Sequence, residues 1–327
     1  MRTLVTGGAG FIGSHYVRRL LADDSGPEVT VLDKLTYAGN RSNLPAEHPR
    51  LTFVHGDVCD GGTVEKLLHG HDTVVHFAAE SHVDRSLTGA QDFVVTNVLG
   101  TQVLMDACLR AEVGRIVHVS TDEVYGSIDA GSWTEDHALE PNSPYAASKA
   151  AADLVVRAYH RSHGLPVMIT RCSNNYGPYQ FIEKAIPLFI TRLLSGREIP
   201  LYGDGLHVRE WLHVDDHCRA VQLVLERGVP GEIYHIGGGT ELANRDLVRR
   251  LLVLCGADRS RVRPVPDRKG HDRRYALDSG RIERELGFRP AVPFDAGLAE
   301  VVRWYDDHRE WWESAAARAA PTPESPL

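Results

Sequence analysis

The segment Arg2-Thr-Leu-Val-Thr-Gly-Gly-Ala-Gly-Phe-Ile-Gly13 decides the fold, because an apolar strand runs directly into three evenly spaced glycines. A helical pattern follows from Ser14 to Leu21. In such a unit, Gly7 permits the tight turn, Gly10 lets the backbone approach a phosphate, and Gly13 lets the helix pack on the strand. The helix N-terminus adds unpaired N–H groups and a partial positive charge. The segment therefore predicts a cradle for the pyrophosphate of a dinucleotide.

A second apolar strand, Val29 to Leu32, ends at Asp33, twenty residues beyond Gly13. A carboxylate there accepts hydrogen bonds from the adenosine ribose hydroxyls and repels a 2′-phosphate, so we expect NAD and not NADP. Lys34 follows directly and would weaken that discrimination. Glycine-rich turns are common, and an ordinary strand, turn and helix without a cofactor is the alternative.

The composition is that of an ordinary globular protein and excludes several classes of function. The chain has 327 residues, 43% hydrophobic and 24% charged, with a net charge of −8, which argues against general nucleic-acid binding. Its five cysteines are scattered and never form a C-x-x-C pair, so neither a disulfide framework nor a metal site is expected. No apolar run approaches the length that spans a bilayer. We therefore expect a cytoplasmic protein without a bound metal.

Apolar runs alternate with helical patterns through the first half of the chain, which is typical of a parallel sheet with helices on both faces. The predicted fold class is α/β: a doubly wound, Rossmann-like parallel sheet with a smaller, discontinuous α/β lid domain. Further strands are expected at Leu51–Val54, Thr73–Phe77, Arg115–Val119, Val167–Thr170 and Glu232–Ile236. We assign 1–173, 210–243 and 283–312 to the NAD-binding domain, 174–209 and 244–282 to the lid, and 315–327 to a frayed, disordered tail.

The carboxyl ends of parallel strands meet at one edge of such a sheet, and ligands bind there. Thr121, Asp122 and Glu123 follow a buried strand, and Tyr145 and Lys149 lie four residues apart on one face of a predicted helix. The lysine can hydrogen-bond a nicotinamide ribose and, with the oxidised ring, lower the pKa of the phenol, which then takes a hydroxyl proton. Two further carboxyl groups are more than an alcohol oxidation requires. They indicate an oxidation that sets up an elimination.

These motifs resemble those of the extended short-chain dehydrogenase/reductases and, within them, the dTDP-glucose 4,6-dehydratases. The similarity runs from Thr6 to about Trp312, nearly the whole chain. The glycine motif and the Tyr/Lys pair mark only the superfamily, whereas the acid pair is more specific, since related epimerases generally lack it. The markers are Thr6-Gly-Gly-Ala-Gly-Phe-Ile-Gly-Ser14, Phe77-Ala-Ala-Glu-Ser-His-Val-Asp84-Arg85, Ser120-Thr-Asp-Glu-Val-Tyr-Gly126, Tyr145-Ala-Ala-Ser-Lys149, Asn174-Asn-Tyr-Gly-Pro-Tyr179 and Gly270-His-Asp-Arg-Arg-Tyr275.

The resemblance implies a reaction cycle on a nucleotide-linked glucose with catalytic NAD. Tyr145 removes the proton from the 4-hydroxyl while the hydride of C4 passes to NAD⁺. The ketone acidifies C5, from which Glu123 takes a proton, and protonated Asp122 donates to the departing 6-hydroxyl. Hydride then returns to C6 as C5 is reprotonated, so the net chemistry is loss of water, a lyase reaction. Two unlike acid sites suit this cycle, because they hold different protonation states.

The resemblance also implies the residues of the site. The expected catalytic residues are Thr121, Asp122, Glu123, Tyr145 and Lys149. The expected cofactor-binding residues are Gly7, Gly10, Phe11, Ile12, Gly13, Asp33, Lys34, Leu35, Thr36, Asp57, Val58, Phe77, Ala78, Ala79, Ser81, Thr96, Tyr145, Lys149 and Asn175. The expected substrate-binding residues are Ser81, Thr121, Asn174, Lys184, Ala185, Pro200, Tyr202, Arg209, Asn244, Arg268 and His271. Arg209 and Arg268 suit a pyrophosphate, because a guanidinium offers a planar fork of donors.

The implied partners are a nucleotide sugar of the dTDP-glucose type and a second copy of the chain. The resemblance implies a homodimer built from helices like Gln91–Leu109 and Tyr145–Arg161, with no nucleic acid or membrane bound. The strictness of the dTDP preference stays open, because Ile182, His207 and Lys269 depart from the family pattern in the lid. The alternatives are another dehydratase, epimerase or decarboxylase on the same fold and, in a different class, a non-catalytic dinucleotide sensor.

Overall fold

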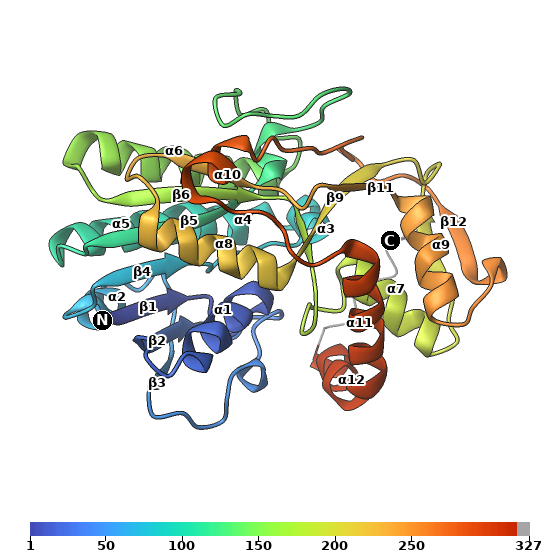
Figure 1. The fold of residues 1–327 in the computed structure, drawn as a ribbon, viewed down its shortest axis with the longest axis horizontal. Helices are drawn as coiled ribbons and strands as arrows, with labels where there is room; N and C mark the ends of the chain where they lie inside the picture. Colours follow the sequence, from blue (N-terminus) through green and yellow to red (C-terminus); the bar gives the residue numbers. More distant parts are fainter. Residues whose placement is uncertain (319–327) are drawn as a thin grey trace.

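The strand that precedes the glycine turn lies inside a parallel sheet, as the sequence predicts (Figure 1). The computed structural model describes residues 1–318, within which seven strands form one sheet in the order β10-β6-β5-β4-β1-β2-β3. All neighbouring strands in it are parallel. The strands are β1 (Arg2–Thr6), β2 (Glu28–Asp33), β3 (Leu51–His55), β4 (Thr73–His76), β5 (Arg115–Thr121), β6 (Val167–Cys172) and β10 (Ile233–Ile236).

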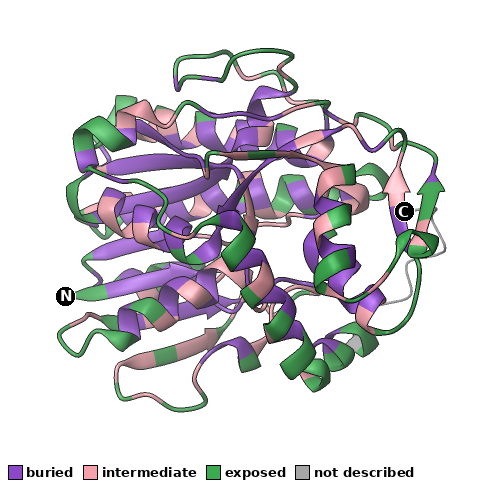
Figure 2. Cartoon of the chain, turned by 45° about the vertical axis from the view of Figure 1, so that its right-hand side comes forward, coloured by how far each residue is buried: buried purple, intermediate pink, exposed green. Residues whose placement is uncertain are grey.

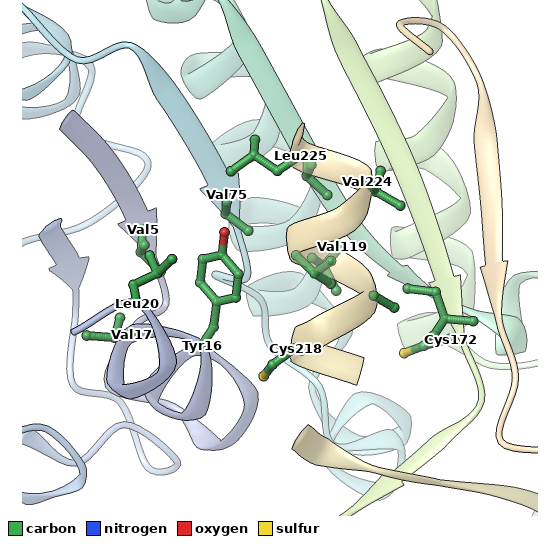
Figure 3. Close-up of a cluster of buried hydrophobic side chains, with 14 of the residues drawn as sticks. Val5, Tyr16, Val17, Leu20, Val75, Val119, Cys172, Cys218, Val224 and Leu225 are labelled. Carbon is green, nitrogen blue, oxygen red and sulfur yellow. The ribbon is translucent and has the colours of Figure 1, made fainter. Parts of the chain in front are cut away.

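Helices cover both faces of this sheet, each face with its own hydrophobic core. On one face, Tyr16 and Val17 of α1 and Val224 of α8 pack with Val5 and Val75 of the strands (Figure 3). Apart from the edge strand β3, the strands are largely buried on both faces (Figure 2), which explains why they appear in the sequence as continuous apolar runs. The helices of the first face are α1 (Phe11–Ala22), α8 (Val214–Arg227) and α10 (Gly280–Leu286), and those of the second are α2 (Gly61–Leu68), α5 (Gly100–Arg110) and α6 (Pro144–His163).

The segment between β4 and β5 is helical but less regular than the predicted helix Gln91–Leu109. It contains a six-residue π-helix, η2 (Val94–Leu99), which continues into α5. A π-turn closes wider rings than an α-helix, and hydrophobic periodicity does not reveal it. The preceding elements are α3 (Val83–Thr88) and α4 (Ala90–Phe93), and short 3₁₀ turns elsewhere are η1 (Arg41–Asn43), η3 (Asp122–Tyr125) and η4 (Arg259–Arg261).

The strand order reverses between β1 and β4, so the loops that follow these strands diverge and leave a crevice between them. Thr6 of β1 lies level with His76 of β4, and His76 lies level with His118 of β5. Because β5 continues to Thr121, it extends past the end of β4. The turn that follows β5 therefore stands above the crevice.

A smaller region packs beside the carboxyl ends of the large sheet (Figure 1). Its core is formed by residues such as Phe189, Leu251 and Leu298 from three different helices. Among the described residues it contains a three-stranded and a two-stranded sheet, in the orders β11-β9-β7 and β12-β8. The strands are β7 (Asn174–Tyr176), β8 (Ile199–Tyr202), β9 (Val208–His213), β11 (Thr240–Ala243) and β12 (Val262–Val265). The helices are α7 (Ala185–Leu194), α9 (Asn244–Leu254), α11 (Phe294–Asp307) and α12 (Arg309–Arg318).

Three of the predicted domain ranges differ from the regions in which the structure places their elements. The ranges 210–243 and 283–312 were expected in the larger domain, but β11 and α11 lie in the smaller region. The predicted tail 315–327 is helical in its first part, where Ala315 is buried in α12, and residues 319–327 lie outside the described chain. An amphipathic stripe shows that a helix packs, and does not show on which core. None of the described helices has the length and apolar character to cross a membrane.

Candidate active site

A side chain is excluded at two positions of the glycine turn, at one by the chain that follows β4 and at the other by the turn itself. Gly7 has a φ of 70°, and a Cβ atom there would lie 2.5 Å from the nitrogen of Ala78. A Cβ atom on Gly13 would lie 2.3 Å from the carbonyl oxygen of Gly7. At Gly10 the contact nearest to such an atom is that same oxygen, at 3.3 Å. Packing therefore requires Gly7 and Gly13, while Gly10 leaves its backbone open toward the crevice.

The N-terminus of α1 faces this opening. Its N-cap, Gly10, has no side chain to accept from the first N–H groups, and its first turn carries no acidic residue. Phe11, Ile12 and Gly13 line the crevice. Unpaired N–H groups and the helix dipole favour an anion here. The turn therefore fits the pyrophosphate of a dinucleotide.

Asp33 lies beside the crevice with both carboxylate oxygens fixed by the backbone. Its Oδ2 accepts from the N–H of Ala9 at 2.8 Å, and its Oδ1 accepts from the N–H of Leu35 at 2.8 Å. Burial raises the pKa of Asp33, and these two bonds oppose that shift. Each oxygen keeps a lone pair for a ribose hydroxyl. The ammonium of Lys34 lies 2.6 Å from Asp57, so the cation expected to weaken the discrimination against NADP has its own counter-ion.

A cavity of about 280 Å³ connects the glycine turn with the turn that follows β5. All five predicted catalytic residues line it, and so do all the predicted cofactor-binding residues except Leu35. Leu35 has a φ of 53° and lies in the loop behind Asp33, where its backbone N–H orients the carboxylate. Of the predicted substrate-binding residues, those that line the cavity are Ser81, Thr121, Asn174 and Lys184.

Tyr145 and Lys149 lie in the first turns of α6, which begins with Ser143 as N-cap and a proline at its first position. The ammonium of Lys149 donates to the carbonyl oxygen of Val119 at 2.8 Å, and burial lowers its pKa to about 8. Burial, and then the carboxyl group of Glu123, raises the pKa of Tyr145 well above its usual value. Lys149 was expected to oppose this, but the protein charges that act on the phenol are mainly negative. A base at Tyr145 therefore needs an added positive charge beside it.

Asp122 and Glu123 occupy one 3₁₀ turn, yet their surroundings are unlike. Asp122 is buried, and burial followed by the charges of Glu123 and Glu210 raises its pKa well above its usual value. Thr121 donates to its Oδ1 at 3.2 Å. Glu123 is partly exposed, and although burial also raises its pKa, three cations oppose the shift, Lys184 most strongly. Asp122 is therefore the stronger candidate for a proton donor, and Glu123 is the stronger candidate for a carboxylate base.

The other predicted substrate-binding residues lie in the smaller region and do not line the cavity itself. Arg209 on β9 is buried and donates to the carbonyl oxygens of Val208 at 2.7 Å and Asp272 at 2.9 Å. Arg268 lies 3.3 Å from Asp84. Both arginine charges lower the pKa of Glu123, so they face the acid pair. Ala185 begins α7, Asn244 begins α9, Pro200 and Tyr202 belong to β8, and His271 follows β12.

In the smaller region, the carboxylate of Asp267 contacts the imidazoles of His207 and His271. Its oxygens lie 2.6 Å from Nδ1 of His271 and 3.2 Å from Nε2 of His207. These are metal-ligand types within 4.8 Å of one another. However, the two rings are stacked, with centroids 3.7 Å apart and planes 13° apart, so their in-plane lone pairs run side by side and do not converge on one ion. The charges of Arg209 and Arg273 also bear on His207. Asp267 and the stacked ring of His207 therefore fix the orientation of the His271 imidazole.

The predicted set lacks several residues of the cavity wall, among them Tyr37, Glu80, Gln180 and Phe181. The rings of Tyr37 and Phe181 lie 5.5 Å apart, which brings the loop after β2 against the start of the smaller region. Glu80 lies inside a marker motif, and Gln180 directly follows another. Adjacency to the motifs could have identified these two, whereas the meeting of the two rings depends on the tertiary fold.

Comparison with known proteins agrees with this geometry. The family model described as GDP-mannose 4,6 dehydratase matches residues 4–301. A dTDP-glucose 4,6-dehydratase from Actinoplanes sp. is 59% identical over 95% of this chain and 100% of its own length. A crystal structure of the dTDP-glucose 4,6-dehydratase from Streptomyces venezuelae, with NAD and TYD bound, is 66% identical and superposes with a TM-score of 0.95, covering 96% of this chain and 100% of that one.

Enzymes of other activities share the fold at lower identity. A crystal structure of UDP-glucose 4-epimerase from Thermotoga maritima, with UDP-glucose, is 32% identical with a TM-score of 0.88, covering 94% of this chain and 99% of that one. The chain belongs to the family of nucleotide-sugar 4,6-dehydratases within the extended short-chain dehydrogenase/reductases. Within that family its close relatives are the dTDP-glucose 4,6-dehydratases, which are NAD-dependent hydro-lyases.

Asp33 provides a test of cofactor selection. In Asp33→Asn the charge is lost and one of the two backbone N–H groups faces an amide donor, so NAD affinity should fall by about tenfold to a hundredfold. NADP, no longer repelled, should lose much less. Titration of the NAD-free protein with both cofactors measures the ratio, and Asp24→Asn, at an exposed position after α1 and outside the cavity wall, is the control. An unchanged NAD/NADP ratio in Asp33→Asn would remove Asp33 from the ribose site.

Proposed function

We propose that the chain converts dTDP-glucose to dTDP-4-keto-6-deoxyglucose and water, with NAD as a bound, regenerated cofactor. The observation that carries the proposal is the unlike pair Asp122 and Glu123 at the wall of the dinucleotide cavity. An epimerase requires no proton donor for a departing hydroxyl group. A buried, protonated acid next to a cation-supported carboxylate supplies both partners of an elimination.

The first step falls to Tyr145, Lys149 and Thr121. Tyr145 takes the proton of the sugar 4-hydroxyl, and the Thr121 hydroxyl lies beside it to orient the same oxygen. Lys149 is held by Val119 in the cofactor half of the cavity, where its ammonium can bind a ribose hydroxyl. NAD, when bound, would supply the hydride acceptor for C4, the hydride donor for C6, and the positive charge that favours the phenolate.

The elimination falls to the acid pair. Glu123 takes the proton of C5, and its carboxylate form is supported by Lys184, Arg268 and Arg209. Asp122 gives its proton to the 6-hydroxyl, which leaves as water. The two roles need opposite protonation states at one pH, and the different burial of the two carboxyl groups supports that division.

We also propose that the larger region binds NAD and the smaller region binds the nucleotide sugar. The crevice residues Gly7 and Asp33 belong to the larger region, whereas Lys184, Arg209 and Arg268 reach the acid pair from the smaller one. A cationic group suits a nucleoside diphosphate. The TYD bound in the similar Streptomyces venezuelae structure supports a dTDP-linked sugar.

The proposal extends to a homodimer in the cytoplasm. Val94 and Leu99 of η2 and Leu154 of α6 expose about half of their surfaces (54%, 49% and 54%), and η2 packs beside α6. Together they form an apolar face on the helices expected to pair. All five cysteines are free, which suits a reducing compartment.

The products decide between the activities. Purified protein carrying its own NAD should convert dTDP-glucose to a product lighter by one water, detected by mass spectrometry, without added reductant. The 4-keto product should also absorb near-ultraviolet light in alkali. UDP-glucose and GDP-mannose in parallel reactions test the nucleotide preference. A product of unchanged mass would indicate an epimerase, and accumulation of free NADH would indicate a net dehydrogenase.

The two acids should fail at different steps. Glu123→Gln should lose about 100- to 10,000-fold in dehydration, the usual contribution of a general base, while bound NADH still appears because C4 oxidation precedes its step. Asp122→Asn should exchange the C5 hydrogen with D₂O faster than it releases water. Dehydration by Glu123→Gln near the wild-type rate would show that another group is the base.

The dimer is tested on its apolar face. Leu154→Glu places a charge inside the proposed interface, so light scattering after gel filtration should show a monomer. Val253→Glu, at an 80% exposed position on α9, is the matched control and should remain dimeric. If Leu154→Glu stays dimeric, the subunits pair through another surface.

A further inference from the structure

The start of α3 carries three charged contacts that the proposed chemistry does not use. Figure 1 shows α3 at the junction between the large sheet and the smaller region. Arg85 forms a two-pronged pair with Glu183, with Nε at 2.9 Å from Oε2 and Nη2 at 2.5 Å from Oε1. His82 lies 3.5 Å from the same carboxylate, and Asp84 lies 3.3 Å from Arg268. Within the described part of the chain, His82, Asp84 and Arg85 do not belong to the cavity wall.

Their partners are the two segments that bring cations to Glu123. Glu183 immediately precedes Lys184, whose ammonium donates to the carbonyl oxygen of Ser81 at 2.5 Å. Arg268 comes from the segment that follows β12. Lys184 and Arg268 are the two charges that most favour the carboxylate form of Glu123. The six-residue helix α3 and its N-cap His82 therefore contact both segments of the smaller region that carry cations beside the proposed base, Glu123.

Arg85 also packs against the wall of the cofactor cavity. The guanidinium of Arg85 lies 4.1 Å above the ring of Tyr37, and that ring meets Phe181. Tyr37 and Phe181 both line the cavity. The Arg85–Glu183 pair is partly shielded, with side-chain exposures of 28% and 14%, so it is screened less by water than a surface pair. Breaking it would release the Tyr37–Phe181 cover and the Lys184 segment together.

We propose that His82, Asp84 and Arg85 form a latch that joins the two regions, and that its residues are positioning residues for the reaction. The latch holds Lys184 and Arg268 toward Glu123 and keeps the cofactor cavity covered. The first role rests on the proposed function, whereas the second does not. The charged and titratable groups that face Glu123 are Asp122, Tyr145, Lys184, Arg209, Arg268, Asp272 and Tyr275.

The test is a double-mutant cycle with Arg85→Gln, Glu183→Gln and the double variant, made as the full chain with its NAD. Arg249→Gln is the control, because Arg249 pairs with Asp246 at 2.7 Å on the surface of the smaller region, away from the latch. The first readout is release of bound NAD into excess labelled NAD. Each single variant should release NAD roughly tenfold faster, as expected for one lost charge-assisted bond, and the double should add little.

The second readout is the pH dependence of dehydration. Weaker support from Lys184 raises the pKa of Glu123, so the acid limb of kcat should move about one pH unit upward. Arg85→Lys, which keeps the charge without the fork, should lie between wild type and Arg85→Gln on both readouts. Additive effects of the two substitutions would overturn the latch. A lower melting temperature of the Arg85 and Glu183 variants, with NAD release and the acid limb of kcat unchanged, would also overturn it, because the pair would then serve stability alone.

The two proposals fail separately. Without any dehydration in the wild-type protein, the proposed function fails, while NAD release still measures the cover over the cavity. With normal dehydration and NAD release equal to wild type in Arg85→Gln and Glu183→Gln, the latch fails and the proposed function stands.

Discussion

The backbone of the glycine turn touches the backbone at the end of β4, and no side chain fits between them. A Cβ atom on Gly7 would lie 2.5 Å from the nitrogen of Ala78. This contact lies where the strand order reverses, so the loops on its two sides diverge and leave a crevice. The parallel register then brings the ends of β2, β4 and β5 to the same edge. Asp33 and the acid pair therefore share one cavity although they lie far apart in the sequence.

Within that cavity, burial shifts the pKa values of acidic and basic groups in opposite directions. It raises the pKa values of Asp122 and Tyr145, which keeps their protons on, and it lowers the pKa of Lys149 to about 8. Glu123 escapes part of this effect because its side chain faces the cations of the smaller region. The protein alone thus places an acid with a raised pKa beside a carboxyl group supported by cations, as the proposed elimination requires. In the proposed oxidation, a further positive charge beside Tyr145 would favour the phenolate, and an oxidised nicotinamide would supply that charge.

The large sheet and most of the cavity wall could be predicted from the sequence because their signals are local. Strands buried on both faces appear as apolar runs, and the residues after them lie at one edge by the geometry of parallel sheets. The division of the smaller region could not be predicted in this way. The apolar stripe of α11 fits either core, and only the tertiary fold places it against α7 and α9. Likewise, neither Arg85 nor Glu183 shows in the sequence that the other, 98 residues away, is its partner.

Several polar and charged contacts join the two regions. Each region has its own apolar core, whereas the α3 latch joins them through charges. At another edge, Trp311 of α12 donates to Asn43 at 2.9 Å, and Asn43 donates to the carbonyl oxygen of Ala9 in the glycine turn at 3.0 Å. A polar contact can be replaced by contacts with water at a small net cost in free energy. Separating an apolar core costs much more, because its surface becomes exposed to water. These polar contacts therefore cost less to break than either core, and they connect the glycine turn and Arg268 to the boundary between the regions.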